Sequence, residues 1–297
     1  MENAAYLPEE EYLVSVRGGD LSVFRYGPVG GTPIVALHGT TSSNRAWQWF
    51  ARTMNSRGHT VYALDTRGRG NSNHLPAPFG LAAHSADLLA VLDYLGIDSC
   101  DVVGHSSGAF GAAAFAQLHP EHVSRLILID GGIPLPLPAG FTIEQINAFI
   151  LGPALARLSM TFDSFQAYRE YFVGQPAFVK GWSPALDEYF RYDLRGVAPE
   201  FHPSTNKDAV AGDSLDLFND SQVNEVLKNF SSEILLLRAP RGLQNGDALY
   251  PEQVLVETLK NFPAVRYVNV DDVNHYDILT DQGGADKCVE LIYGKQG

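Results

Sequence analysis

The sequence predicts an α/β fold in which a mostly parallel sheet of about eight strands is flanked by helices. Short runs rich in β-branched residues alternate with longer amphipathic stretches, the pattern typical of strands joined by helices over a parallel sheet. The 297 residues are enough for one large domain with a continuous core. Hydrophobic residues make up 45% and charged residues 19% of the chain, which is the composition of a globular protein.

The expected strands begin with a hairpin near the N-terminus. The segments EYLVSV and DLSVFRYG flank Gly18 and Gly19, which favour a tight turn between antiparallel strands. Six further strands are expected over 33–39, 60–68, 100–106, 124–132, 233–240 and 265–276. Helices are expected over 44–57, 82–95, 107–118, 251–261 and 277–293. Because ligands bind at the carboxyl ends of parallel strands, the residues that follow each strand are the candidates for a site.

The segment before the strand at 233–240 breaks this alternation. A connection of roughly ninety residues without structure of its own would be unusual. It contains helical patterns instead, such as SFQAYREYFV and PALDEYFRYDL. We therefore predict a helical cap over 133–226, inserted into a core domain of residues 1–132 and 227–297.

The predicted cap is rich in aromatic residues, which suit the lid of an apolar pocket. Trp182 and Tyr189 are the candidate substrate contacts within it. An inserted helical layer also needs a core of its own, so we expect more than half of the cap's aromatic residues to serve packing.

The charge of the chain narrows the range of partners. It has 34 acidic and 21 basic residues, and the resulting net charge of -13 repels nucleic acids and anionic membranes.

The N-terminal MENAAYLPEEEYL has no basic segment followed by an apolar one, and no apolar run reaches the length of a membrane span. Two cysteines, Cys100 and Cys288, do not make a disulfide framework and fit a reducing compartment. We expect a cytoplasmic protein without nucleic-acid or membrane partners; a homo-oligomer is left open.

The segment Gly104-His105-Ser106-Ser107-Gly108 has the pattern G-x-S-x-G. It lies between the buried strand CDVV and the alanine-rich helix SGAFGAAAFAQL, where a nucleophile elbow is found. Small residues must flank the serine of such an elbow because the strand and helix backbones nearly touch. A serine that only caps the helix is the alternative. We favour a nucleophile because two further motifs follow strands at the right distances.

With these motifs the sequence resembles the α/β-hydrolase fold enzymes, specifically the capped esterase, lactonase and C–C hydrolase branch. The resemblance covers about residues 12–132 and 228–295. Besides the elbow it is carried by three segments, namely His38-Gly39-Thr40, DTRGRGNS at 65–72 and VNHY at 273–276. It implies the α/β-hydrolase fold with an inserted helical cap, and neither a cofactor nor a metal.

The resemblance also implies the roles of several residues. The base should follow the last strand, where His275 can take the serine's proton and return it to the leaving group. The oxyanion hole should come from the backbone N–H groups of Thr40 and Ser107, with His38 shaping the loop. Gly39 in that loop is a candidate substrate contact. Plain surface residues are expected at His59, His74, His84, His119, His122 and His202.

The acid has two candidates. In most of the family the carboxylate follows the strand after the cap, and here Asp247 stands there, four residues before Pro251. It lies nine residues beyond Arg238, however, in a loop longer than the pattern expects. The rival Asp130 ends the strand LILI, a position that some capped relatives use. We favour Asp130 and keep Asp247 as the alternative; either would hold the imidazole tautomer and stabilise the imidazolium.

A serine at the elbow argues against the dehalogenases and epoxide hydrolases of this fold, which use an aspartate there. We predict a serine hydrolase that cleaves a carboxylic ester or lactone of a neutral, largely apolar small molecule through an acyl-enzyme on Ser106. One alternative is a C–C hydrolase for vinylogous diketo acids, with Arg157, Arg169 or Arg241 binding the anionic substrate. The others are a perhydrolase with the same triad and a ligand receptor whose hydrolysis is slow or absent.

Overall fold

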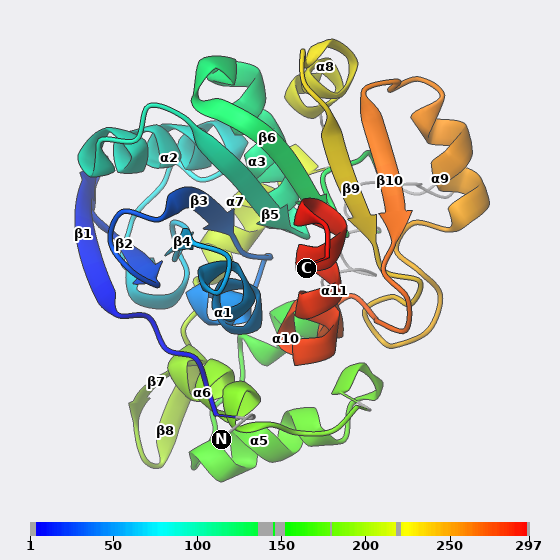
Figure 1. The fold of residues 1–297 in the computed structure, drawn as a ribbon. Coiled ribbons are helices and arrows are strands. Elements are labelled where there is room, and N and C mark those ends of the chain that lie inside the picture. The colour runs from blue at the N-terminus through cyan, green and yellow to red at the C-terminus, as the bar shows by residue number, and fades with distance from the viewer. Residues whose placement is uncertain (1–3, 136–144, 146–151, 179, 218–220, 296–297) are drawn as a thin grey trace.

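The centre of the protein is a sheet of eight strands in the order β1-β2-β4-β3-β5-β6-β9-β10 (Figure 1). The computed structural model describes residues 4–135, 145, 152–178, 180–217 and 221–295. The strands are β1 (Glu10–Val16), β2 (Gly19–Tyr26), β3 (Thr32–Leu37), β4 (His59–Leu64), β5 (Cys100–His105), β6 (Val123–Ile129), β9 (Ile234–Arg238) and β10 (Val265–Asn269). Strand β2 pairs antiparallel with β1 and β4, and the other neighbours are parallel. The predicted α/β fold class is confirmed.

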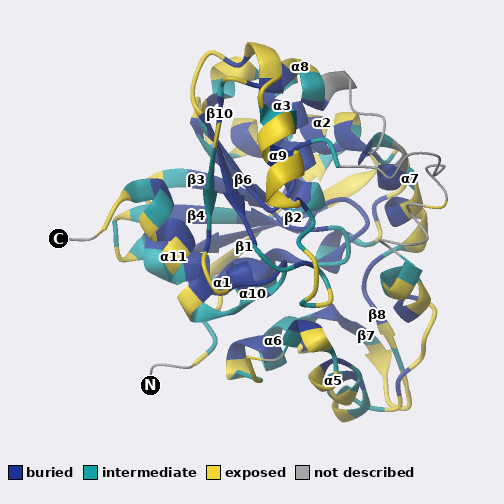
Figure 2. Cartoon of the chain, turned by 90° about the vertical axis from the view of Figure 1, so that its right-hand side faces the viewer, coloured by how far each residue is buried: buried dark blue, intermediate teal, exposed yellow. Residues whose placement is uncertain are grey.

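Both faces of the sheet are buried, because consecutive residues of a strand pack on opposite sides. In β5, Val102 joins one apolar cluster and Val103 the other; Leu128 and Ile129 of β6 divide in the same way. The inner strands β3, β4 and β6 are accordingly mostly dark blue in Figure 2, whereas the edge strands β1 and β10 are less buried. Burial on both sides explains why these strands read as continuous hydrophobic runs such as LILI.

Helices cover the two faces. The described helices on one face are α1 (Gln48–Asn55), α10 (Asp277–Thr280) and α11 (Gln282–Tyr293). The other face carries α2 (Leu81–Leu95), α3 (Ser107–Leu118), α8 (Ser221–Asn229) and α9 (Glu252–Leu259). The single helix predicted over 277–293 is divided at Asp281, which has extended backbone and caps α11 by accepting a hydrogen bond from the N–H of Gly284.

Between β6 and β9 the chain forms a further layer beyond the sheet, seen at the bottom of both Figure 1 and Figure 2. Its described elements include α5 (Phe165–Val173), α6 (Pro184–Asp193), β7 (Leu194–Val197) and β8 (Glu200–Pro203). The chain then continues into α7 (Lys207–Leu217), which lies above this layer in both views. The side chains of Ser164 and Ser183 cap the first turns of α5 and α6. We refer to residues 133–226 as the inserted segment; its parts at 136–144, 146–151, 179 and 218–220 lie outside the described residues.

The inserted segment has a small core of its own. Aromatic rings pack on one another there, as in the stacked pair Phe172 and Phe190, whose centroids are 4.0 Å apart. Helix α8, by contrast, packs on α3 in the core layer. The predicted domain boundary at 226/227 therefore falls within a helix of the core. None of the described helices is both long and apolar enough to cross a membrane.

Candidate active site

Ser106 occupies a strained turn between β5 and α3. Its φ of 56° and ψ of -124° lie in a region that residues other than glycine rarely adopt. The flanking glycines are required by close contacts. A Cβ on Gly104 would lie 2.2 Å from the carbonyl oxygen of Gly108, and a Cβ on Gly108 would lie 2.2 Å from that of Leu37. The turn places the serine hydroxyl at the carboxyl end of β5 and the N–H of Ser107 in the first turn of α3.

A histidine that follows another strand contacts Ser106, and an aspartate that follows a third strand contacts the histidine. His275, in the segment after β10, has its Nε2 3.0 Å from Ser106 Oγ and its Nδ1 2.7 Å from Asp130 Oδ2. Asp130 directly follows β6, and its Oδ1 accepts a hydrogen bond of 3.0 Å from the N–H of Ala239. The side chains of His275 and Asp130 are 3% and 0% exposed. This arrangement can move a proton from the hydroxyl to Nε2 while the carboxylate holds the proton on Nδ1.

The structure separates the two candidate acids. Asp130 has a positive φ of 43°, and the turn after it packs tightly on the elbow: a Cβ on Gly131 would lie 2.2 Å from the carbonyl oxygen of Ser106. This contact brings the carboxylate to the imidazole. Asp247 is exposed in the loop between β9 and α9, and Asp130 occupies the position at Nδ1 that Asp247 would need.

The loop after β3 faces the serine. A Cβ on Gly39 would lie 3.1 Å from Ser106 Cβ. The buried His38 ring accepts a hydrogen bond of 3.1 Å at Nε2 from the N–H of Thr66, so its Nδ1 carries the proton and donates to the Gly39 carbonyl at 2.8 Å. In a trans peptide the C=O and the N–H point in opposite directions, so fixing the Gly39 carbonyl also fixes the direction of the Thr40 N–H. Burial lowers the pKa of His38 to about 3 and keeps the ring neutral.

The buried His38 should make the stability of the protein depend on pH. Its pKa is about 3 in the folded protein, whereas an unperturbed histidine has a pKa of about 6.5. Below about pH 6.5, His38 binds a proton in the unfolded chain but not in the folded protein. The free energy of unfolding therefore decreases as the pH falls.

We expect the free energy of unfolding of the wild type to fall, relative to His38→Gln, by about 1.4 kcal/mol per pH unit between about pH 6 and 4. Urea unfolding of both proteins at several pH values measures this difference, in which the titration of shared groups cancels. Parallel pH profiles would contradict it.

His105, which precedes the serine, supports the backbone of His275. Its Nε2 lies 2.8 Å from the carbonyl oxygen of His275, and the two rings are 4.8 Å apart. Burial lowers the pKa of His105 well below its usual value, so the neutral ring can donate from Nε2 to this carbonyl. This contact is not predicted by the G-x-S-x-G motif, because His105 fills a variable position of it. Its place at the end of a buried strand, directly before the serine, was the available signal.

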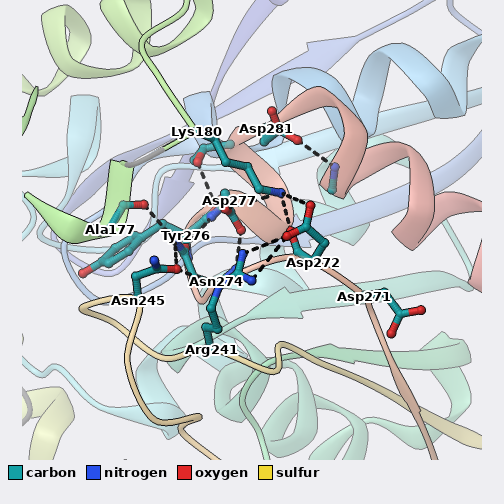
Figure 3. A network of polar contacts seen from close by, with 12 residues as sticks. Ala177, Lys180, Arg241, Asn245, Asp271, Asp272, Asn274, Tyr276, Asp277 and Asp281 are labelled. Carbon is teal, nitrogen blue, oxygen red and sulfur yellow. Dashed lines mark hydrogen bonds and ion pairs between the residues drawn. The ribbon is translucent and has the colours of Figure 1, made fainter.

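Asn274, directly before His275, anchors the loop that carries the imidazole (Figure 3). Its side-chain Oδ1 accepts hydrogen bonds of 2.9 and 3.0 Å from the N–H groups of Tyr276 and Asp277. Its Nδ2 donates to the carbonyl of Ala177 in the inserted segment at 2.8 Å. Asn274 is fully buried, so these bonds are shielded from water. The loop that carries His275 is thereby attached to the inserted segment through Ala177. The sequence gives no local signal for this contact.

A cavity of about 100 Å³ opens on Ser106 and His275. Gly39, Thr40 and Ser107 line it beside the nucleophile. Apolar side chains form most of the remaining wall, namely Phe110, Leu135, Leu217, Leu243, Leu249 and Leu279. Of the described residues that line this cavity, none is Asp, Glu, Lys or Arg.

The two aromatic residues predicted as substrate contacts have different positions. Tyr189 lines the cavity, and its hydroxyl donates to Ser42 Oγ at 3.0 Å. Trp182 instead stacks on Phe190 at 5.1 Å, and its Nε1 donates to Asp187 at 2.6 Å. The prediction for Trp182 is corrected because richness in aromatic residues does not separate those that pack inside a cap from those that face a pocket.

Comparison with known proteins identifies the family. The sequence profile of the alpha/beta hydrolase fold family matches residues 32–282. The chain belongs to this family. The matched range of this α/β hydrolase contains Ser106, Asp130 and His275.

The curated relatives of this α/β hydrolase have several activities. A 2-hydroxy-6-oxononadienedioate/2-hydroxy-6-oxononatrienedioate hydrolase of Burkholderia vietnamiensis is 31% identical over 147 residues, which are 46% of this chain and 50% of the relative. A lipase of Mycobacterium tuberculosis is 35% identical over 134 residues, 45% of this chain and 49% of the lipase. The chain thus spans about half the length of these relatives.

Solved structures show the same fold over almost the whole chain. The thioesterase domain from the curacin biosynthetic pathway superposes with a TM-score of 0.75 over 95% of this chain and 98% of that domain, at 19% sequence identity. At 19% identity this structural similarity establishes the fold alone.

Proposed function

We propose that this α/β hydrolase is a serine hydrolase that cleaves a carboxylic ester or lactone of a neutral, largely apolar small molecule. The observation that carries the proposal is the chain of hydrogen bonds from Ser106 through His275 to Asp130, with the serine facing an apolar cavity. A hydroxyl beside a buried base that is oriented by a carboxylate is the arrangement needed for nucleophilic acyl transfer.

In the first half of the reaction, Ser106 Oγ attacks the ester carbonyl carbon while His275 Nε2 takes the hydroxyl proton. Asp130 keeps the other proton on Nδ1 and stabilises the imidazolium. The N–H groups of Thr40 and Ser107 receive the negative charge that develops on the carbonyl oxygen, and the amino end of α3 favours that charge. The tetrahedral intermediate then breaks its bond to the alcohol oxygen, which takes the proton from His275.

In the second half, water replaces the alcohol. His275 takes a proton from the water as its oxygen attacks the acyl carbon, and the same N–H groups hold the second oxyanion. Breakdown of this intermediate releases the carboxylic acid and restores the Ser106 hydroxyl. With a lactone, the alcohol stays attached to the acid and a single hydroxy acid leaves.

The lining of the cavity supports a neutral substrate. A carboxylate placed among apolar side chains without a partner would lose its hydration without compensation. Tyr189, Ser42 and Thr41 also line the cavity, and their hydroxyl groups can orient a polar but uncharged substituent.

A C–C hydrolase for a diketo acid is the second candidate, because a curated relative hydrolyses such dioates. Of the arginines considered for its carboxylate, Arg169 pairs with Asp187 at 3.1 Å and Arg241 pairs with Asp272 at 3.3 Å. Neither is among the described residues that line the cavity at Ser106.

Arg157 is the third arginine considered for that carboxylate. It lines a second cavity, of about 70 Å³, that shares Tyr189 and Tyr276 with the first. Its guanidinium is paired with the buried carboxylate of Asp193 at 2.8 Å. Since its charge is already met by Asp193, Arg157 attracts a substrate carboxylate less than a free arginine would. This pairing favours the ester over the diketo acid.

A pair of matched esters tests the proposal. We expect kcat/KM for p-nitrophenyl pentanoate to exceed that for p-nitrophenyl hemisuccinate, which has a similar length but carries a charge, by about 100-fold. Release of nitrophenolate is followed for both esters under the same conditions. A higher kcat/KM for the hemisuccinate would favour the hypothesis that the protein is a C–C hydrolase for a diketo acid. Failure to hydrolyse either ester faster than Ser106→Ala would favour a ligand receptor.

As part of the same proposal, the protein works in a reducing cytoplasm on a small molecule, without nucleic-acid or membrane partners. The buried thiols of Cys100 and Cys288 and the net charge of -13 support this.

A further inference from the structure

A second buried polar cluster consists of Arg69, His84 and Asp213. The three residues come from the loop after β4, from α2 and from α7 of the inserted segment. Asp213 Oδ2 lies 2.5 Å from Arg69 Nη1 and 3.0 Å from His84 Nε2. Their side chains are only 2%, 10% and 6% exposed in the order Arg69, His84, Asp213. His84, expected as a plain surface residue, is therefore part of a buried network.

Arg69 connects this cluster to the loop that faces Ser106. Its Nε donates a hydrogen bond of 3.0 Å to the carbonyl oxygen of Thr40. A small cavity of about 20 Å³ is lined by all three members of the cluster and by Gly39 and Ser107. The cluster thus lies directly behind the two backbone segments that carry the proposed oxyanion donors.

The carboxylate of Asp213 compensates the buried positive charge of Arg69. A guanidinium remains protonated even when buried, so its desolvation must be offset by a partner. Burial alone would raise the pKa of Asp213, but His84 and Arg69 together hold it below its usual range, so the carboxyl group is ionised. Its Oδ1 also accepts a hydrogen bond of 2.6 Å from the N–H of Gly80. Both carboxylate oxygens are therefore fixed.

We propose that Arg69 is a positioning residue for the oxyanion hole, and that Asp213 of the inserted segment holds Arg69 in place. The inference rests on the proposed function. His38 fixes the peptide before Thr40 through the Gly39 carbonyl, and Arg69 fixes the peptide after it through the Thr40 carbonyl. With both peptide planes held, the Thr40 N–H is aimed before substrate arrives, which is the condition for strong stabilisation of an oxyanion.

The chain offers a matched control. Asp213→Asn keeps the shape of the side chain and the acceptor for Gly80 but removes the charge that holds Arg69. Asp87→Asn removes a buried carboxylate from a similar pair in the same region, since Asp87 binds Arg67 at 3.0 and 2.6 Å. The other hydrogen bonds of the Arg67 guanidinium go to the carbonyls of Arg17 and Pro76, and none goes to Thr40. The Arg67 backbone carbonyl accepts a hydrogen bond of 2.9 Å from Arg69 Nη1, a contact that Asp87→Asn leaves in place.

Two measurements are made on the full chain, namely steady-state hydrolysis of p-nitrophenyl butyrate and the affinity for an alkylboronic acid. The boron atom accepts the Ser106 oxygen and becomes tetrahedral, so its affinity reports on the oxyanion donors. For Asp213→Asn we expect kcat to fall about 10-fold, boronate affinity to fall by the same factor and KM to change by less than about twofold. For Asp87→Asn, kcat, KM and boronate affinity should each stay within about twofold of the wild-type values.

Arg69→Lys provides a second test should Asp213→Asn not fold, because lysine keeps the charge but lacks the planar fork that contacts both Asp213 and Thr40. It should lower kcat and boronate affinity together. Unchanged boronate affinity in Asp213→Asn or in Arg69→Lys would overturn the positioning role. A wild type that neither turns over the ester nor binds the boronic acid would overturn the proposed function as well, so the two failures are distinguishable.

Discussion

Replacing Ser106 with alanine should lower kcat for a p-nitrophenyl ester by at least about 10⁴-fold. Without the hydroxyl no acyl-enzyme forms, and only binding and the oxyanion donors remain to assist water. Alanine has the same Cβ as serine, so the strained turn at φ 56° should be retained. Steady-state kinetics and thermal unfolding of the purified variant test both parts of this expectation.

Ser124→Ala is a suitable control for this substitution. Ser124 is an exposed serine at the start of β6 whose hydroxyl donates to Ser99. Its replacement should leave kcat within about twofold of the wild type. A wild type no faster than Ser106→Ala would contradict the assignment of Ser106 as nucleophile.

Replacing Asp130 with asparagine should lower kcat by about 10⁴-fold. The amide can donate to Nδ1 of His275, which favours the tautomer with the proton on Nε2. That nitrogen then cannot accept the proton of Ser106, although the geometry of the site is preserved. The effect should appear in kcat and kcat/KM for esters, with KM little changed.

Asp247→Asn is the matched control, because this exposed aspartate was the alternative acid in the sequence. We expect its kcat to stay within about twofold of the wild type. The opposite result, a large loss with Asp247→Asn and a small one with Asp130→Asn, would assign the acid to Asp247.

The strands and the three motifs around the serine were predictable because their signals are local. A strand buried on both faces appears as a continuous apolar run, and the elbow needs its glycines wherever a strand and a helix nearly touch. A Cβ added to Gly104 or to Gly108 would lie 2.2 Å from a backbone carbonyl oxygen, which is the physical reason for the G-x-S-x-G pattern. The positions of Ser106 and His275 follow from such patterns together with chain order.

Other features depend on packing between distant segments and leave no local signal. The reach of Asp130 to His275 depends on Gly131 packing against Ser106, which only the assembled sheet brings about. The same holds for the contact between Asn274 and Ala177, 97 residues apart in sequence. Trp182 was assigned from the aromatic content of the cap, and that content does not say which rings stack inside it.

The hydrogen bond from Asn274 to the carbonyl of Ala177 bears on how new specificities arise in this protein. A segment transplanted from another protein in place of the inserted segment would have to present a backbone carbonyl at the place of Ala177, or the loop that carries His275 would lose a support. Exchange of side chains such as Tyr189, which faces the cavity, keeps that support. Point substitution within the inserted segment is therefore a more accessible route to a new substrate range than exchange of the whole segment.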